Sequence, residues 1–297
     1  MLSTNKKNTW ALFLNQSVQG ASHKRDDKPL QDFSISGSAE FSNSFLQKTR
    51  VIYAIVADGH GGAKYFRSAR GSQLACFLCE NSIQQLFNEK VIDVSDENKI
   101  RNVLSHFCNR LILNWRDTVI KDFKQNELSE NEKIICDKEK INYNNISDDD
   151  IPTFYGSTLL AVVCVQNKFW FAIQLGDGKC VGINYDETIF YPIEDFYPEE
   201  EDGKFICGRT ASLCNKDASS SFKISYGFEK KILGLACMTD GVADSFSTEK
   251  LPDFILKIRA NALDDLEKTK EELASFLPEL SKKGSMDDVS ISALFLQ

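Results

Sequence analysis

The chain has 297 residues, of which 42% are hydrophobic, and this is enough apolar material for a substantial core. Acidic residues outnumber basic ones, and the net charge of -8 excludes the broad basic face with which proteins neutralise nucleic-acid phosphates. We therefore expect one domain over residues 1–297 and no nucleic-acid partner.

The cysteines indicate a reducing compartment. There are nine of them, an odd number, and they are scattered rather than paired as in a small secreted scaffold. Cys76 and Cys79 form an isolated C-x-x-C in an apolar run, which we interpret as buried helix thiols rather than a zinc site. The first thirty residues lack a signal-like apolar stretch, and no segment reaches the about eighteen apolar residues that span a bilayer. We expect a soluble, cytoplasmic protein without a membrane partner.

The first half of the chain contains two strand patterns followed by two helix patterns. Apolar runs at 9–18 and 50–57 predict strands, and the second run ends abruptly in D-G-H-G-G. Residues 63–88 and 98–125 repeat apolar side chains every three or four positions, which predicts two amphipathic helices that pack side by side. Residues 126–151 are polar, and we expect a surface loop or insertion there.

Strand patterns dominate the second half. Residues 186–209 are acidic and contain Pro192, Pro198 and Gly203, which favours an irregular flap. The other expected elements are strands at 157–165 and 169–174, a strand that starts near Lys179, strands at 222–226 and 232–238, helices at 248–262 and 266–280, and a closing strand at 289–296.

Five short motifs place an aspartate at a strand end or in a tight turn. They are Gln31-Asp32, Asp58-Gly59-His60-Gly61-Gly62, Gly176-Asp177-Gly178, Thr239-Asp240-Gly241 and Asp287-Asp288. Each motif alone is usually only a turn. Together they could be delivered to one rim of a sheet, where converging carboxylates require a cation. An all-oxygen ligand set selects Mg²⁺ or Mn²⁺, and two such ions can activate a water and hold a phosphate.

The order of these motifs, with Gly156-Ser157-Thr158 between the second and third, resembles the metal-dependent protein phosphatases of type 2C. The resemblance runs from about residue 17 to 297. The opening G-x-S-H followed by Q-D is similar to a divergent branch found mainly in bacteria. The resemblance implies an α+β fold, with two packed antiparallel sheets flanked by pairs of helices. It also implies a single catalytic domain that hydrolyses phosphoserine and phosphothreonine in phosphoprotein substrates with metal-bound water.

The resemblance implies a centre of two or three Mn²⁺ or Mg²⁺ ions. Its metal ligands would be Asp32, Asp58, the Gly59 carbonyl, Asp177, Asp240 and Asp287. In this arrangement Asp58 is shared between two ions, Asp32 acts through water, and Asp177 helps Asp240 to hold a third, weaker ion. His60 would be the general acid that protonates the leaving oxygen. The alternative for His60 is an imidazole that only hydrogen-bonds its own turn.

The chain departs from the family pattern at two positions. Gln31 replaces a glutamate, so metal affinity should be weaker, and Asp27 stands where the family has a phosphate-binding arginine. Arg25 or His23 could bind phosphate instead, although both could simply belong to a solvated turn. These departures leave two alternatives open. The chain could be a catalytically weak or inactive binding or sensing module, or a phosphatase of small phosphoesters. We expect the flap at 186–209 to select substrates.

Overall fold

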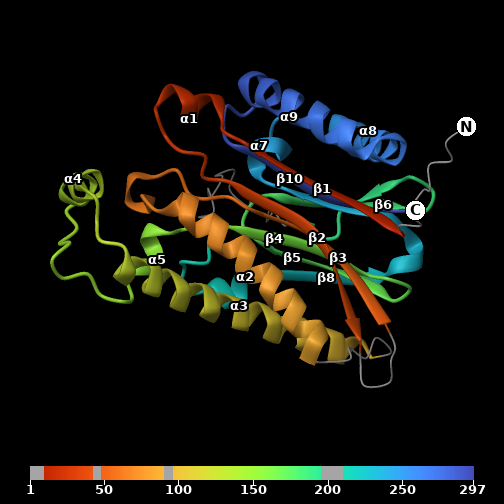
Figure 1. The fold of residues 1–297 in the computed structure, drawn as a ribbon, viewed down its shortest axis with the longest axis horizontal. Coiled ribbons are helices and arrows are strands. Elements are labelled where there is room, and N and C mark those ends of the chain that lie inside the picture. Colours follow the sequence, from red (N-terminus) through yellow and green to blue (C-terminus); the bar gives the residue numbers. More distant parts are fainter. Residues whose placement is uncertain (1–9, 43–47, 90–95, 195–209) are drawn as a thin grey trace, which may run out of the picture.

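The computed structural model describes residues 10–42, 48–89, 96–194 and 210–297. Two five-stranded antiparallel sheets form the centre of the molecule (Figure 1). The first sheet contains, in spatial order, β1 (Ala11–Val18), β10 (Val289–Leu296), β9 (Ile232–Met238), β6 (Lys179–Asn184) and β7 (Ile189–Phe190). The second contains β2 (Phe33–Ser42), β3 (Lys48–Ala57), β4 (Leu159–Val165), β5 (Phe169–Leu175) and β8 (Lys223–Phe228).

Two pairs of long helices cover the outer faces of the sheets. The helices α2 (Ser68–Glu89) and α3 (Glu97–Gln125) pack on the second sheet, whereas α8 (Lys250–Asp264) and α9 (Leu266–Lys283) pack on the first (Figure 1). The short helices are α1 (Ala21–Arg25), η1 (Ala63–Tyr65), α4 (Glu130–Lys138), α5 (Ile151–Phe154), α6 (Ala218–Ser221), η2 (Glu229–Lys231) and α7 (Asp240–Ala243). The predicted α+β fold of two packed sheets flanked by helix pairs is confirmed.

Strand β3 shows why such apolar strands form the centre of this fold. Residues 51–57 of β3 are all buried because both faces are covered. Val51, Tyr53 and Ile55 belong to the cluster beneath α2 and α3. Ile52 and Ala54 alternate with them and face the other sheet, where they join the cluster between the sheets. A strand with two covered faces is apolar at every position rather than at every second one.

The structure differs from the sequence prediction in the polar segment at 126–151. Helix α4 occupies its first half, and Ser129 and Glu132 form a capping box at its N-terminus. The side chain of Cys136 is the buried residue of this helix. The pattern S-x-x-E marks the start of a helix, and it can do so in a polar segment where the apolar periodicity of a helix is missing. Strand β2 was not predicted either, because residues 33–42 contain many serines. Most of the flap prediction, residues 195–209, lies outside the described residues.

The cysteine prediction is confirmed for the described residues. Cys76 and Cys79 are buried in α2, and burial raises the thiol pKa of each well above its ordinary value. The other described cysteines are also buried, and none of them forms a disulfide. Across the described ranges, no helix is both long enough and apolar enough to cross a membrane.

Candidate metal centre

The strand topology brings the aspartate motifs to one edge of the sandwich. Strands β3 and β5 are both antiparallel to β4, so they run in the same direction and end at the same edge. Asp58 directly follows β3, and Asp177 comes two residues after β5. Asp240 likewise comes two residues after the end of β9. Three carboxylates therefore leave three strand ends on the same side.

The remaining aspartates stand just before strands that begin at this edge. Asp32 precedes β2, whose first residue, Phe33, pairs with Ala57 at the end of β3. The Asp287-Asp288 pair precedes β10, which runs antiparallel to β9. Both sheets contribute to the cluster, so the packing of one sheet on the other assembles it.

Asp58, Asp177 and Asp240 form the centre of the cluster. One carboxylate oxygen from each lies within 4.8 Å of the others. Burial raises the pKa of Asp58 well above its usual range, and the nearby charges of Asp32 and Asp240 raise it further. Burial, with the charges of Asp177 and Asp287, raises the pKa of Asp240 to about 7. Carboxylates that repel one another in this way are suited to a divalent cation, which would neutralise them.

Asp32 is the buried member of the group. Its side chain accepts a hydrogen bond of 2.7 Å from the Thr239 hydroxyl, which in turn accepts one from the backbone N–H of Ser290. Burial raises the pKa of the Asp32 carboxyl well above its usual range, and the charge of Asp288 raises it further. Asp32 does not line the open cavity but acts on Asp58 through its charge.

A cavity of about 350 Å³ opens over the cluster. Its lining residues are His23, Asp58, Gly59, His60, Gly61, Tyr65, Asp177, Thr210, Asn215, Asp240 and Asp287. The structure therefore gathers most of the predicted site residues around one space. Thr210 was not predicted, and its hydroxyl donates a hydrogen bond of 2.7 Å to Asp177. Neither Thr210 nor Asn215 stands in a motif that could have revealed it.

His60 is held between the D-G-H-G-G turn and Gly156. Its backbone N–H donates to the Gly156 carbonyl at 3.1 Å, and its ring meets the edge of the Tyr65 ring with 4.8 Å between centroids. A Cβ atom at position 156 would lie 2.7 Å from His60 Cδ2 and 2.6 Å from Tyr65 Cδ1. Gly156 is therefore required for both rings to take these positions.

A family model described as protein phosphatase 2C matches residues 19–278. The chain belongs to the protein phosphatase 2C family. It is thereby assigned to the metal-dependent phosphoprotein phosphatases, a class of hydrolases. No curated protein matches the sequence.

Solved structures agree with the fold. The chain is similar to a bacterial serine phosphatase, with 15% identity, 97% of each chain covered and a TM-score of 0.54. It is also similar to the serine/threonine phosphatase Stp1 from Staphylococcus aureus, with 14% identity, 97% and 94% coverage and a TM-score of 0.53. PppA from Pseudomonas aeruginosa has 12% identity, 97% and 99% coverage and a TM-score of 0.54. Identities this low support the type 2C fold only.

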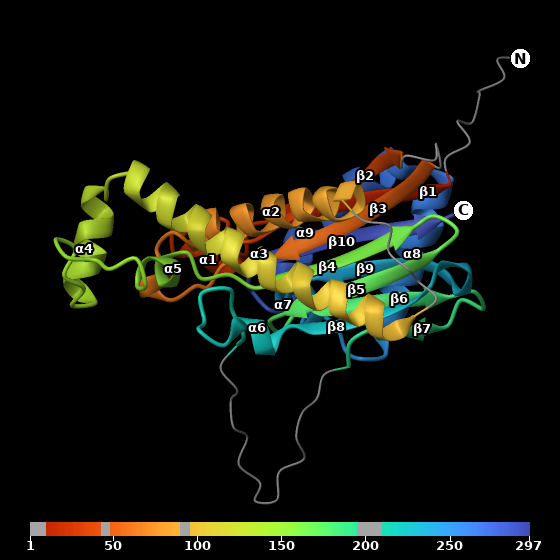
Figure 2. The ribbon, with the colours of Figure 1, turned by 90° about the horizontal axis from the view of Figure 1, so that it is seen from below.

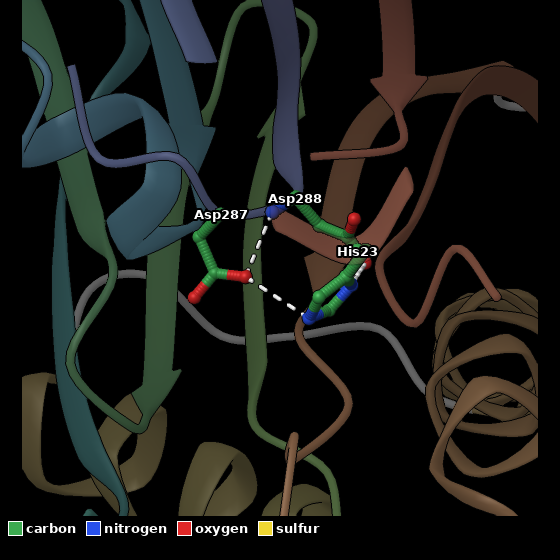
Figure 3. A group of neighbouring side chains, drawn as sticks. All are labelled: His23, Asp287 and Asp288. Atoms are coloured by element: carbon green, nitrogen blue, oxygen red, sulfur yellow. Dashed lines mark hydrogen bonds and ion pairs between the residues drawn. The ribbon is translucent and has the colours of Figure 1, made fainter. Parts of the chain in front are cut away.

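Within this type 2C fold, His23 lies beside the adjacent aspartates Asp287 and Asp288 (Figure 3). Its Nδ1 is 2.9 Å from Asp288 Oδ2, within ion-pair distance but without the direction of a hydrogen bond. Its Nε2 is 3.5 Å from Asp287 Oδ1. Asp287 is half exposed towards the cavity, and the backbone N–H of Asp288 donates to its Oδ1 at 2.8 Å. These contacts orient the carboxylate of Asp287.

Gln31 occupies the position of the family's glutamate and supports the D-G-H-G-G turn. Its Nε2 donates to the His60 carbonyl at 3.2 Å, and its own carbonyl accepts from the Gly59 N–H at 3.2 Å. Its Oε1 is buried and has no hydrogen-bond partner among the described residues. A Cβ atom at position 61 would lie 3.8 Å from this Oε1, so the oxygen points towards Gly61 at the cavity wall.

Arg25, the other predicted phosphate-binding residue, does not line the cavity. Its side chain is 66% exposed and donates to Asp26 from Nε at 2.8 Å. Asp27, which stands where the family has arginine, adopts a left-handed backbone conformation with φ 52°. Among the described lining residues no lysine or arginine is present, so His23 is the predicted phosphate-binding residue that the structure brings to the cavity.

Proposed function

We propose that this chain hydrolyses phosphoserine and phosphothreonine esters of phosphoproteins, with two or three Mn²⁺ or Mg²⁺ ions held by the aspartate cluster. The observation that carries the proposal is the approach of the Asp58, Asp177 and Asp240 carboxylates to within 4.8 Å at a cavity that His60 also lines. Hard divalent cations prefer such oxygen ligands. Membership of the type 2C family supports the same reaction.

The proposed ligands are the residues that the cavity and the strand ends bring together. Asp58 would be shared between two ions, with the Gly59 carbonyl, Asp240 and Asp287 as further ligands. Asp177 would act with Asp240 on a third ion. Asp32, which is buried, would act on the cluster through water. When bound, the ions would supply an activated water and neutralise the phosphate charge.

We assign proton transfer and phosphate binding to two histidines. His60 lines the cavity and would donate a proton to the serine or threonine oxygen as it leaves, a role that suits imidazole near neutral pH. His23 faces the same space and is the proposed contact for the phosphate. Arg25 is the second candidate, and its guanidinium would have to leave Asp26 to reach the phosphate.

Two broader features belong to the proposal. Both sheets contribute strand ends to the cluster, which supports one catalytic domain over residues 1–297. The described cysteines are buried and form no disulfide, which supports a reducing, cytoplasmic location.

The test is hydrolysis of a phosphothreonine peptide by the purified chain with Mn²⁺, with Mg²⁺ and with EDTA. Activity should require the metal, and Asp58→Ala and Asp240→Ala should each reduce kcat by about a hundredfold or more. An inactive wild type that still binds Mn²⁺ would instead indicate a binding module. Hydrolysis of small aryl phosphates alone would indicate a small-molecule phosphatase.

A further inference from the structure

A second groove lies next to the catalytic cavity and is not used by the chemistry described above. It has a volume of about 370 Å³, and its lining residues are Lys64, Glu139, Ile141, Asn142, Asn145, Ile146, Asp150, Thr153 and Phe154. Lys64 lines this groove, whereas the next residue, Tyr65, lines the catalytic cavity. The two spaces therefore share η1 as a common wall.

The outer wall of the groove is formed by residues that directly follow α4 in the segment 126–150. Figure 1 and Figure 2 both show α4 at the end of the molecule where α1 and α5 lie. Arg67, whose side chain is only 9% exposed, fastens this segment to the start of α2: its Nε donates to Glu132 at 2.6 Å, and its Nη2 donates to the Asn126 carbonyl at 3.0 Å. A buried guanidinium bonded in this way holds a fixed geometry. These bonds fix α4, and the groove residues from Glu139 onward continue directly from its end.

The chemistry of the groove suits a peptide segment. Ile141 and Ile146 provide apolar surface above the buried ring of Phe154, and the side chains of Asn142 and Asn145 are exposed beside it. Glu139 is exposed, and no described residue pairs with its carboxylate. The ammonium group of Lys64 lies over the Tyr65 ring, 4.8 Å from its centroid.

We propose that this groove binds the part of the phosphoprotein substrate that flanks the phosphorylated residue, taking up an apolar side chain and a neighbouring lysine or arginine. The inference rests on the proposed function. Because neighbouring residues of η1 line the two spaces, an extended peptide, which advances about 3.3 Å per residue, would need only a few residues to reach from one to the other. Glu139 provides the opposite charge for the basic side chain. The groove then selects substrates without taking part in the reaction.

The first test uses charge reversal. The wild type and Glu139→Lys are assayed with Mn²⁺ on phosphopeptides that carry lysine or glutamate at positions flanking the phosphothreonine, and on p-nitrophenyl phosphate, which fills only the cavity. Glu139→Lys should lower kcat/KM about twofold to fivefold for at least one lysine-flanked peptide, in line with an exposed ion pair. It should raise kcat/KM for the peptide that carries glutamate at the same position. Asp137→Lys is the matched control, because Asp137 is exposed near the end of α4, two residues before Glu139, and does not line the groove.

The second test fills the groove. Asn145→Trp should raise KM for the peptides and leave p-nitrophenyl phosphate hydrolysis unchanged, whereas Asn144→Trp, at an exposed neighbour outside the groove, should change neither. Equal effects of each variant and its control would overturn the inference while the proposed function stands. A wild type that hydrolyses neither p-nitrophenyl phosphate nor any peptide would overturn the proposed function and this inference with it.

Discussion

His23 Nδ1 lies 2.9 Å from Oδ2 of Asp288, the buried carboxylate that also accepts the backbone N–H groups of Gly20 and Gln31 at 2.6 Å each. The N-terminal segment is therefore fastened to the start of β10 by one side chain. Asp287, its neighbour in the sequence, is half exposed and lines the cavity. The two adjacent aspartates thus have separate roles, with Asp287 in the site and Asp288 beneath it.

Substitution of each aspartate should separate these roles. Asp288→Ala leaves two buried backbone donors without an acceptor, and we expect a loss of about 3 kcal/mol in the free energy of unfolding. Asp287→Ala should change stability by less than about 1 kcal/mol in EDTA, because its side chain is half exposed, but should weaken Mn²⁺ binding. Urea unfolding in EDTA measures the free energy of unfolding of each variant, and calorimetric titration measures its affinity for Mn²⁺. Equal destabilisation by the two variants would contradict this division.

The leaving group should reveal the role of His60. His60→Ala removes the proposed acid, so kcat for a phosphothreonine peptide should fall by about 10²-fold or more. Hydrolysis of p-nitrophenyl phosphate should fall much less, since nitrophenolate leaves without protonation. Gly156→Ala should show the same pattern more weakly, because its Cβ would displace the His60 ring. A loss that is equal for both substrates would indicate that His60 only supports the turn.

The pKa of Asp240, raised to about 7, makes the metal-free protein sensitive to pH. The unfolded state releases this proton near pH 4 and the folded state near pH 7, so the contribution of Asp240 to stability falls as pH rises between these values. In EDTA at pH 7.5, Asp240→Asn should therefore exceed the wild type in stability by on the order of 2 kcal/mol. The difference should shrink towards pH 4 and reverse when saturating Mn²⁺ is added. Thermal unfolding of both proteins across this pH range measures the difference in stability. A difference that does not change with pH would contradict the prediction.

Much of this architecture follows from local patterns in the sequence. The apolar runs that become β3, β5 and β9 end in Asp58, Asp177 and Asp240, so the sequence already marks the strand ends that carry carboxylates. Strand β2 has many small and polar residues, and its identity as a strand depends on pairing along its whole length with β3. Propensity is a weak guide where tertiary pairing decides the conformation.

The site residues that were missed lack any local signal. Thr210 reaches Asp177 from a distant part of the chain, and only the fold places its hydroxyl there. The contacts of Gln31 and His23 likewise depend on how the N-terminal segment crosses the starts of β10 and α2. Short motifs predicted the carboxylates that meet at this edge, whereas the neighbours that contact them required the three-dimensional structure.

Gln31 offers a test of the departure from the family pattern. Gln31→Glu adds a negative charge near the cluster and replaces the amide that donates to the His60 carbonyl. In EDTA the variant should be less stable than the wild type by about 1 to 3 kcal/mol, because a carboxylate oxygen would then face that carbonyl. With saturating Mn²⁺ the variant should instead be the more stable of the two, since the added carboxylate attracts cations. The Kd for Mn²⁺ should fall about tenfold, within the range for groups that support a metal site.

Gln31→Ala is the control for the Gln31→Glu substitution. It removes the same hydrogen bond without adding charge, so it should lower stability in EDTA and leave the Mn²⁺ affinity near that of the wild type. Calorimetric titration and thermal unfolding of all three proteins make the comparison. If Gln31→Glu and Gln31→Ala bind Mn²⁺ equally, the missing charge does not limit metal affinity. The amide would then act only by supporting the turn that carries Asp58 and His60.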